Sequence, residues 1–371
     1  MNLINVGITG YTGFIGNCLL NFFHTKSDIN ILTFDDKDFK QDEKLKYFVK
    51  NCDIIIHLAA INRHEDLNIL YETNISLVQS IIDACEKTLS IPKIIFSSSI
   101  QEELDNPYGR SKFEGRKLFE NWALKNNSEC STLIIPNVFG PNCKPFYNSV
   151  VSTFCFQLVN NQKPFINKDS NINFIYVYDL INKIDSLVRN KNKYKNIVRI
   201  KSDIYIKVSN LLDKLENIHK LYFFNNTFPN MENEFDRNLF ITYQSFIPDS
   251  FYPKKNIISS DPRGEFSEIV RSNGKGQFSY SFTKSNVTRG NHFHTRKIER
   301  FSVIEGSAIV KIRKINTNAV KEYSLNKNDF IDIKPWHTHS IENIKKKNLI
   351  TLFWISEHYD SNNSDTFPEI V

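Results

Sequence analysis

Two side chains four residues apart, Tyr108 and Lys112, have the types and spacing to move a proton. On a helix they project from one face, so the ammonium lowers the phenol pKa while the phenol transfers the proton. The run Ser97-Ser98-Ser99 ends an apolar segment shortly upstream, and a hydroxyl there can hydrogen-bond a substrate oxygen. Ser98 and Ser99 both fit, because a one-residue change of strand register exchanges them. The pattern predicts a reductase site.

A second group lies near the other end of the chain, where four of the nine histidines fall in two short segments. His292 and His294, two apart on a strand, face the same side and can reach one ion. Glu299 and one later histidine complete three nitrogens and one carboxylate, a set suited to Zn²⁺, Fe²⁺, Ni²⁺ or Mn²⁺. His337 and His339 are the two candidates for the later position.

A glycine-rich segment near the start of the chain has the spacing of a dinucleotide-binding turn, with Gly10, Gly13 and Gly16 between an apolar run and a helical one. Glycines at this spacing let the backbone approach a pyrophosphate at the positive helix N-terminus. Asp35 follows about 20 residues later, where a carboxylate accepts from the ribose hydroxyls of NAD. Lys37 would instead meet the 2′-phosphate of NADP, so the sequence favours NAD without excluding NADP.

The elements that must position these residues differ between the two parts of the chain. Over the first 200 residues short apolar runs alternate with amphipathic ones, which predicts an α/β Rossmann-type doubly wound parallel sheet. From about residue 257 short alternating runs follow one another, as in an all-β jelly-roll barrel. Two prolines within 246–253 mark a linker. We therefore predict domains at 1–245 and 257–371, joined by a linker at 246–256.

Composition narrows the function classes. The 371 residues, 40% of them hydrophobic, suffice for two cores. With 47 basic and 41 acidic residues the net charge is only +6, and no basic stripe stands out, so no nucleic-acid partner is expected. The first 20 residues show neither a signal peptide nor a membrane span, which predicts a cytoplasmic protein without a membrane partner. The six cysteines lack CxxC pairing and are expected to be reduced core thiols.

Residues 1–240 resemble the extended short-chain dehydrogenases/reductases. The resemblance rests on the glycine turn, His57-Leu58-Ala59-Ala60, Asn74, Ser99, Asn106-Pro107-Tyr108 and the segment 135–140. It implies that Tyr108 is the general acid for ketone reduction, Lys112 its electrostatic partner and Ser99 the residue that orients the carbonyl. It also implies cofactor contacts from Gly10, Gly13, Phe14, Ile15, Gly16, Asp35, Lys37, Leu58, Ala59, Ala60, Asn74, Lys112, Pro136 and Val138.

The histidine segments resemble the two cupin motifs. The first matches fully: His-x-His, four residues, Glu, six residues and Gly306. The second departs, because its usual Pro-x-Gly is Pro-Trp-His and the distance from Pro335 to His339 is one residue short. Asn343 still follows His339 at the motif's distance, so the resemblance implies His339 as the fourth ligand beside His292, His294 and Glu299. His337 is then the alternative ligand or an acid/base residue.

A reductase followed by a cupin resembles the CapF-type bifunctional enzymes of capsular polysaccharide and O-antigen biosynthesis, and the segments 141–149 and 261–264 add to the likeness. In that family the substrate is UDP-2-acetamido-2,6-dideoxy-β-L-arabino-hexos-4-ulose, a UDP-activated 4-keto-6-deoxy amino sugar. The resemblance implies that the cupin epimerises C3. The reductase domain then reduces C4 with NADPH to the L-talo sugar, on the route to UDP-N-acetyl-L-fucosamine.

The same resemblance implies a divalent metal ion, with Zn²⁺ as the first candidate, and a homodimer. It places NADP before NAD, whereas Asp35 and Asp36 suit NAD, so NAD stays open. Two other hypotheses remain. The chain is either a single-function UDP-sugar ketoreductase with a structural, dimerising cupin, or a non-enzymatic nucleotide-sensing protein on the same fold.

Overall fold

The computed structural model describes residues 3–190, 196–202, 204–274 and 276–371. The chain divides into two compact units, the first of residues 1–215 and 241–246, the second of residues 216–240 and 247–371. Two of the three points of division lie within helices α7 (Val208–Ile218) and α8 (Glu234–Gln244), and the third follows Phe246. The domain boundaries proposed from the sequence, at 245 and 257, stay a prediction.

The first unit is built on a six-stranded sheet in the order β2-β1-β3-β4-β5-β8, and every neighbouring pair is parallel. The order reverses between β1 and β3, which makes the sheet doubly wound and confirms the Rossmann-type prediction. Its strands are β1 (Ile4–Thr9), β2 (Ile29–Phe34), β3 (Ile54–His57), β4 (Lys93–Ser99), β5 (Cys130–Ile135) and β8 (Asn196–Arg199).

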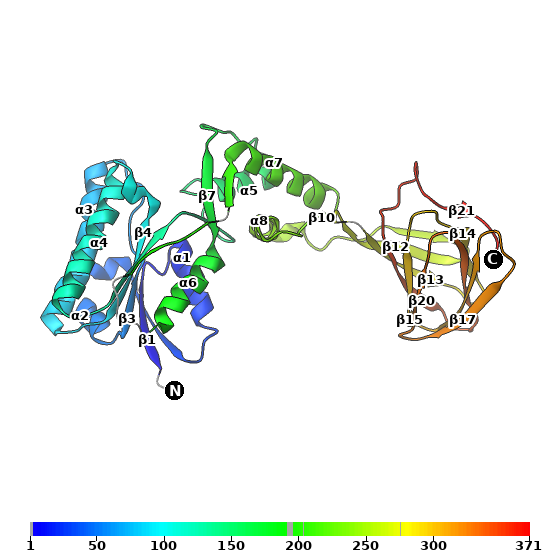
Figure 1. The fold of residues 1–371 in the computed structure, drawn as a ribbon, viewed down its shortest axis with the longest axis horizontal. Helices are drawn as coiled ribbons and strands as arrows, with labels where there is room; N and C mark the ends of the chain where they lie inside the picture. Colours follow the sequence, from blue (N-terminus) through cyan, green and yellow to red (C-terminus); the bar gives the residue numbers. More distant parts are fainter. Residues whose placement is uncertain (1–2, 191–195, 203, 275) are drawn as a thin grey trace. The chain divides into compact units, whose positions relative to one another are not determined.

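Helices cover both faces of this sheet. Figure 1 shows α2, α3 and α4 along one face and α1 and α6 along the other. β3 and β5 are buried at every position, as expected for parallel strands covered on both sides. The helices are α1 (Phe14–Phe23), α2 (Asp42–Lys50), α3 (Leu67–Thr88), α4 (Pro107–Lys125), α5 (Val150–Val159) and α6 (Val177–Arg189), with short helices η1 (Asp36–Lys40) and η2 (Ile100–Glu103).

A small second sheet, in the order β6-β7-β9, lies beyond β5 in the chain. It consists of β6 (Asn137–Phe139), β7 (Asn171–Tyr176) and β9 (Ile204–Lys207). The second unit begins inside α7 and continues with the π-helix η3 (His219–Phe224) and a short strand β10 (Thr227–Phe228); the 3-10 helix η4 (Asp249–Phe251) follows α8. Among the described helices, none is long and apolar enough to cross a membrane.

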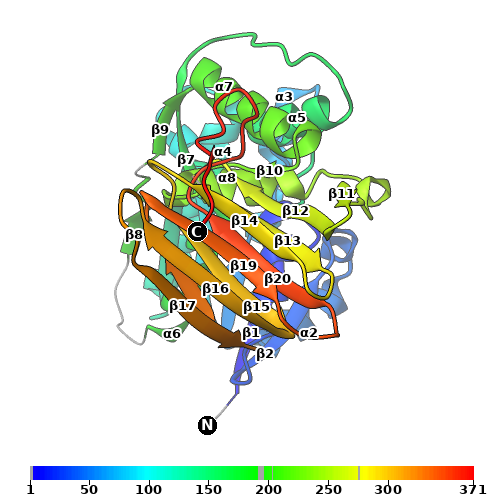
Figure 2. The same cartoon turned by 90° about the vertical axis from the view of Figure 1, so that its right-hand side faces the viewer.

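The second unit contains two sheets, whose strands are antiparallel except for the parallel pair of β10 and β12. One has the order β10-β12-β13-β20-β15-β18, with β11 on β12; the other has the order β17-β16-β19-β14-β21 (Figure 2). The strands are β11 (Ile258–Asp261), β12 (Gly264–Ser272), β13 (Gln277–Thr283), β14 (Thr288–Phe293), β15 (Glu299–Glu305), β16 (Ser307–Lys314), β17 (Val320–Asn326), β18 (Phe330–Ile333), β19 (His337–Asn343), β20 (Leu349–Ile355) and β21 (Phe367–Pro368).

Side chains from both sheets meet in one apolar core. Phe301, Val303 and Phe353 come from the first sheet, and Val310 and Ile341 from the second. On β15, β16 and β20 these side chains alternate with more exposed neighbours, the pattern of sheets packed face to face. This architecture agrees with the expected all-β barrel, while its assignment as a cupin stays a prediction.

Candidate active site and metal centre

The predicted dinucleotide turn joins β1 to α1. Gly10 has φ +69°, a conformation that favours glycine. A Cβ on Gly16 would lie 2.2 Å from the carbonyl oxygen of Gly10, so only glycine allows the turn to close against the helix. Gly13 is the N-cap residue of α1, and no side chain caps this helix N-terminus; Phe14 and Ile15 open its first turn. The free N–H groups at this end suit a phosphate.

The ends of β1 and β3 are tied together at the point where the strand order reverses. Nδ1 of His57 lies 2.9 Å from Oγ1 of Thr9, which also accepts from the N–H of Ala59. Burial lowers the pKa of His57 to about 3, so the ring is neutral. This bond fixes the 58–60 stretch beside the glycine turn, where the sequence places cofactor contacts.

Asp35 and Lys37 follow β2. The Asp35 carboxylate accepts from the backbone N–H of Lys37 at 3.1 Å, and Nζ of Lys37 lies 3.4 Å from it. These interactions lower the pKa of Asp35, so the carboxylate is ionised at neutral pH. An ionised carboxylate at this position suits ribose hydroxyls, whereas the adjacent ammonium suits a 2′-phosphate.

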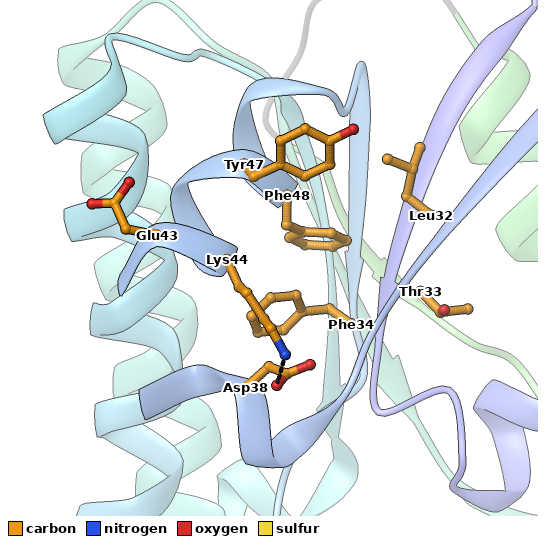
Figure 3. A pocket seen from close by; sticks show the side chains of 8 residues that line it. All are labelled: Leu32, Thr33, Phe34, Asp38, Glu43, Lys44, Tyr47 and Phe48. Carbon is orange, nitrogen blue, oxygen red and sulfur yellow. Dashed lines mark hydrogen bonds and ion pairs between the residues drawn. The ribbon is translucent and has the colours of Figure 1, made fainter. Parts of the chain in front are cut away.

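A pocket of about 360 Å³ lies at the outer edge of β2, beside this turn. Figure 3 shows Tyr47 and Leu32 at one end and the ion pair of Lys44 with Asp38 at the other. β2 is the edge strand of the described sheet, because the chain passes from α2 directly into β3. In the common dinucleotide-binding order another strand lies outside this position. Asp35 and Lys37 are not among the residues that line the pocket.

Helix α4 holds the predicted proton-transfer pair. Asn106 caps its N-terminus by accepting from the N–H of Gly109 at 2.8 Å, and Pro107 occupies the first turn. Tyr108 and Lys112 then lie one turn apart, with Nζ of Lys112 5.8 Å from the centre of the Tyr108 ring. Lys112 is buried and donates to the carbonyl of Ser97 at 2.9 Å. The structure therefore brings the pair together at the end of β4.

Burial shifts both pKa values toward the neutral forms, so the phenol pKa is raised and not lowered as expected from the sequence. Desolvation raises the pKa of Tyr108 to about 12, and the nearby Tyr147 phenol adds to the rise. Desolvation lowers the pKa of Lys112 to about 8, although Glu102 opposes the shift. At neutral pH the phenol therefore keeps its proton and can donate it, while Lys112 is still mainly cationic beside it.

The two candidate serines have different partners. The hydroxyl of Ser98, which is buried, donates to the carboxylate of Glu102. Ser99 is half-buried, and its Oγ accepts from the N–H of Gln101 at 3.2 Å. Because Ser99 keeps its hydroxyl proton available, the geometry favours Ser99 as the residue that donates to a substrate carbonyl.

Two further expected cofactor contacts belong to the frame of this site. Asn74 accepts from the N–H of Ile61 at 2.8 Å and donates to the carbonyl of Ile61 and to Oγ of Ser111. It thereby joins the chain after β3 to the helix that carries the tyrosine. Pro136 lies between β5 and β6, and Val138 lies on β6.

Four of the predicted metal ligands gather between the sheets of the second unit. His292 on β14 is directly opposite His339 on β19, His294 follows the end of β14, and Glu299 opens β15 in the other sheet. One candidate ligand atom from each lies within 4.8 Å of all the others. Oε2 of Glu299 is 3.2 Å from Nε2 of His294 and 3.0 Å from Nε2 of His339.

The positions of the protons on these histidines show whether the cluster can accept a cation. His294 and His339 direct Nδ1 at the carbonyls of Asp365 and His337, so Nδ1 carries the proton. Each Nε2 then presents a lone pair to the Glu299 carboxylate, and these three buried atoms lack hydrogen-bond donors among the described residues. Lone pairs about 3 Å apart repel unless a cation or proton lies between them. A tetrahedral ion with ligands at about 2.0–2.1 Å would separate them by about 3.3 Å, which fits.

His337 lies at the start of β19, outside this four-residue cluster. It is half-buried, and its Nδ1 lies 2.9 Å from the carbonyl oxygen of Pro335. The other ring nitrogen, Nε2, makes no hydrogen bond among the described contacts. The catalytic, cofactor and ligand roles of all these residues stay predictions.

Sequence reasoning missed two residues at these sites. Tyr147 affects Tyr108, but its neighbourhood in the sequence carries no proton-transfer pattern. Asp365 contacts the loop between two metal ligands from near the end of the chain. It resembles any loop aspartate in the sequence, so no spacing signal could have found it.

A doubly wound sheet with a glycine turn, a Tyr-x-x-x-Lys helix and a serine on the neighbouring strand defines a nucleotide-dependent enzyme of the reductase and epimerase class. The profile of the NAD dependent epimerase/dehydratase family matches residues 6–200. The chain belongs to this family. A second profile, the polysaccharide biosynthesis C-terminal domain, matches residues 259–367.

Two relatives match the chain over almost its whole length, and a third matches part of it. The UDP-2-acetamido-2,6-beta-L-arabino-hexul-4-ose reductase of Pseudomonas aeruginosa is 30% identical over 98% of both chains. The crystal structure of the capsular polysaccharide assembling protein CapF from Staphylococcus aureus is 30% identical, with a TM-score of 0.88 over 99% of this chain and all of that one. The UDP-glucose 4-epimerase of Thermus thermophilus with NAD, 15% identical, shares the fold alone, with a TM-score of 0.55 over 66% of this chain and 99% of that one.

Proposed function

We propose that the chain is a bifunctional nucleotide-sugar enzyme acting on a UDP-activated 4-keto-6-deoxy amino sugar. The second unit epimerises C3 and the first reduces C4 with NADPH, toward UDP-N-acetyl-L-fucosamine for a capsule or O-antigen. The observation that carries the proposal is the presence on one chain of the Tyr108 and Lys112 pair and the buried histidine and glutamate cluster. The full-length resemblance to a reductase named for such a 4-keto sugar supports the substrate.

In the first unit, Ser99 orients the C4 carbonyl and Tyr108 donates a proton to its oxygen. A nicotinamide cofactor, when bound, supplies the hydride to C4. The Lys112 ammonium stabilises the phenolate that forms. Because the pKa of Lys112 is about 8, its side chain is still mainly charged at neutral pH. A ketone thereby becomes an alcohol with one hydride and one proton added.

In the second unit, epimerisation begins by removing the proton on C3, which the neighbouring 4-ketone acidifies. A divalent cation, when bound, supplies Lewis acidity that stabilises the enolate charge. His337, through Nε2, is the proposed residue that moves the C3 proton. A proton from solvent then adds to the opposite face and inverts C3, and reduction of the ketone removes the acidifying group and fixes the product.

We propose NADP as the cofactor, with NAD as the alternative, because the chain resembles the CapF-type enzymes. Lys37, whose ammonium is exposed, supports contact with a 2′-phosphate. The ionised Asp35 beside it supports NAD, so both cofactors are compared in the test.

We also propose that the chain forms a homodimer through the outer face of the β12-β13-β20-β15 sheet. The outward positions of its central strands β13 and β20 are largely apolar; Phe278 on β13 is 40% exposed, and Phe330 on the adjoining strand β18 is 59% exposed. Tyr280, Leu352 and Trp354 continue the face between them. A second copy of the same sheet would cover this surface in an isologous pair. Light scattering on wild type and Phe278→Asp tests this: the variant should become monomeric.

The proposed activity is tested with the UDP-4-keto-6-deoxy amino sugar in D₂O. Without cofactor, NMR should show deuterium entering C3; with NADPH or NADH, it should show reduction at C4. Tyr108→Phe should keep the exchange and lose reduction, whereas His339→Asn should lose the exchange. Reduction without any exchange would instead support a structural barrel. Binding of cofactor without either reaction would support a nucleotide sensor.

A further inference from the structure

The segment that follows β20 returns to the metal cluster near its end. It leaves the barrel after Ile355 and rejoins it as β21, where Pro368 pairs with His292 and Phe367 with Phe293 (dark red in Figure 1). Between these points Asp365 is turned inward, with a side chain 0% exposed. An aspartate buried so completely needs partners for its charge.

The partners of the Asp365 carboxylate are successive groups of one loop. Oδ1 accepts from the N–H of Thr295 at 3.1 Å and from its hydroxyl at 2.5 Å. Oδ2 accepts from the N–H groups of Arg296 and Lys297 at 3.1 and 3.2 Å. These three residues lie between His294 and Glu299, so one carboxylate fixes the backbone that separates two of the four candidate ligands.

The backbone of Asp365 acts on a ligand directly. Its carbonyl oxygen accepts from Nδ1 of His294, which leaves the Nε2 lone pair directed at Glu299. The residue has φ +46°, and this left-handed conformation turns the carbonyl and the carboxylate toward the same loop. Partners of this kind set ring orientation and tautomer at metal sites.

Two side chains of the loop return the contact. Nζ of Lys297, which is buried, donates to the carbonyl of Ser364 at 2.6 Å. The Arg296 guanidinium donates to the carbonyl of Asn363 at 3.1 Å and pairs with Glu357 at 3.0 Å. The segment 357–366 and the loop 295–297 therefore form one hydrogen-bonded unit.

We propose that Asp365 is a positioning residue for the metal centre, and that through it the segment 357–366 sets how tightly a divalent cation is held. This inference rests on the proposed cation site, because a site that bound no cation would have nothing to position. Asp365 is not itself a ligand; it acts through His294 and through the loop that leads to Glu299.

The test compares Asp365→Asn with wild type in the full chain. Asparagine has nearly the same shape and tolerates φ above zero, but it replaces one charged acceptor with an N–H₂ group that faces backbone donors. Asp360→Asn is the matched control, since Asp360 lies exposed in the same segment and its carboxylate accepts only a local N–H, that of Asn362, among the described contacts.

Metal-free protein is titrated with Co²⁺, whose visible absorption reports the number and geometry of ligands, and with Zn²⁺ against a chelator of known affinity. Asp365→Asn should weaken binding roughly 10- to 100-fold and change the Co²⁺ spectrum. Asp360→Asn should stay within about twofold of wild type. Equal affinity and spectra for Asp365→Asn and wild type would overturn the inference, while absence of binding to wild type would refute the cation site itself.

Thermal unfolding and NAD(P)H binding check that each variant is folded. If Asp365→Asn does not fold, Asp365→Gly is used, because glycine keeps the left-handed backbone and its carbonyl while removing the carboxylate. Thr295→Val removes only the hydroxyl donor and should weaken Zn²⁺ binding by a smaller factor than either substitution. Wild-type affinity in the folded Asp365→Gly variant would refute the role of the carboxylate.

Discussion

The ion pair of Glu102 and Arg116 joins the serine-bearing strand end to the helix that carries the tyrosine. Nε and Nη2 of Arg116 donate to the carboxylate oxygens of Glu102 at 2.8–3.1 Å. The two side chains are only 6% and 8% exposed, and Ser98 donates to the same carboxylate. Since α4 places Tyr108, Lys112 and Arg116 at successive turns, this pair holds the helix against η2. We predict that Glu102→Gln destabilises the first unit and lowers the rate of ketone reduction.

The magnitude follows from burial. Removing one partner of a buried pair leaves an uncompensated charge, which costs about 3–5 kcal/mol. Arg116 keeps Glu120 at 3.2 Å, so we expect the lower end, about 3 kcal/mol, for Glu102→Gln. Arg116→Met leaves Glu102 with the Ser98 hydroxyl among its described partners, so it should cost more, near 5 kcal/mol. A loss of about 3 kcal/mol lowers the unfolding midpoint of a unit this size by roughly 6–12 °C.

The assay is urea unfolding followed by a probe of the first unit, with reduction measured below the unfolding transition. Glu103→Gln is the control. Glu103 also forms an ion pair, with Arg199, but both side chains of this pair are more than 60% exposed. The substitution should cost less than about 1 kcal/mol. The double variant Glu102→Gln/Arg116→Met should cost clearly less than the sum of the two single ones. Equal small losses for Glu102→Gln and Glu103→Gln would refute the reasoning.

Three further outcomes are expected. Lys112 has a folded-state pKa of about 8 against 10.5 unfolded, so its burial penalty is complete below pH 8 and disappears as the pH rises to 10.5. Lys112→Met should therefore raise the unfolding free energy at pH 7 by about 3 kcal/mol and not at pH 10.5, while abolishing reduction. Asp35→Ser should shift the NADPH to NADH ratio of kcat/KM upward roughly tenfold, about 1.4 kcal/mol. Chelation should lower the melting midpoint of the second unit by about 8–16 °C relative to protein with Zn²⁺ at 1,000 times its Kd; an unchanged midpoint would count against the metal centre.

The sequence contained enough to predict the doubly wound sheet, because its central strands are buried on both faces and appear as continuous apolar runs. β3, with Ile54, Ile55 and Ile56 all at most 6% exposed, is an example. The position of β2 at the edge of the described sheet was not predicted. β2 is at the edge because α2 leads straight to β3, with no further strand among the described residues between them to pair outside β2. The alternation of apolar runs does not say which strands become neighbours.

The candidate sites divide in the same way. Pairs within one element, such as Tyr108 with Lys112, are encoded by the period of a helix or strand, and the structure brings them together. Partners far apart in the chain are not encoded by any period. The contact of Glu102 with Arg116 and that of Asp365 with the loop after His294 form only through the tertiary fold, so only the structure reveals them.

At the irregular second histidine motif, contacts with the first histidine segment hold a turn that lacks the usual motif glycine. His337 stands where the motif usually has glycine, and the residue before it, Trp336, adopts the left-handed conformation, with φ +61°, at a cost of about 1–2 kcal/mol. Its N–H donates to the carbonyl of His294 at 2.7 Å, and its ring stacks on Phe293 with centroids 6.0 Å apart. The turn is therefore held by the first histidine segment itself. β19 then starts at His337, so the second inward position falls on His339, at 3.0 Å from Glu299. The distance from His339 to Asn343 favoured His339 in the sequence and left His337 as the alternative; the structure places His339, and not His337, with the other three candidate ligands.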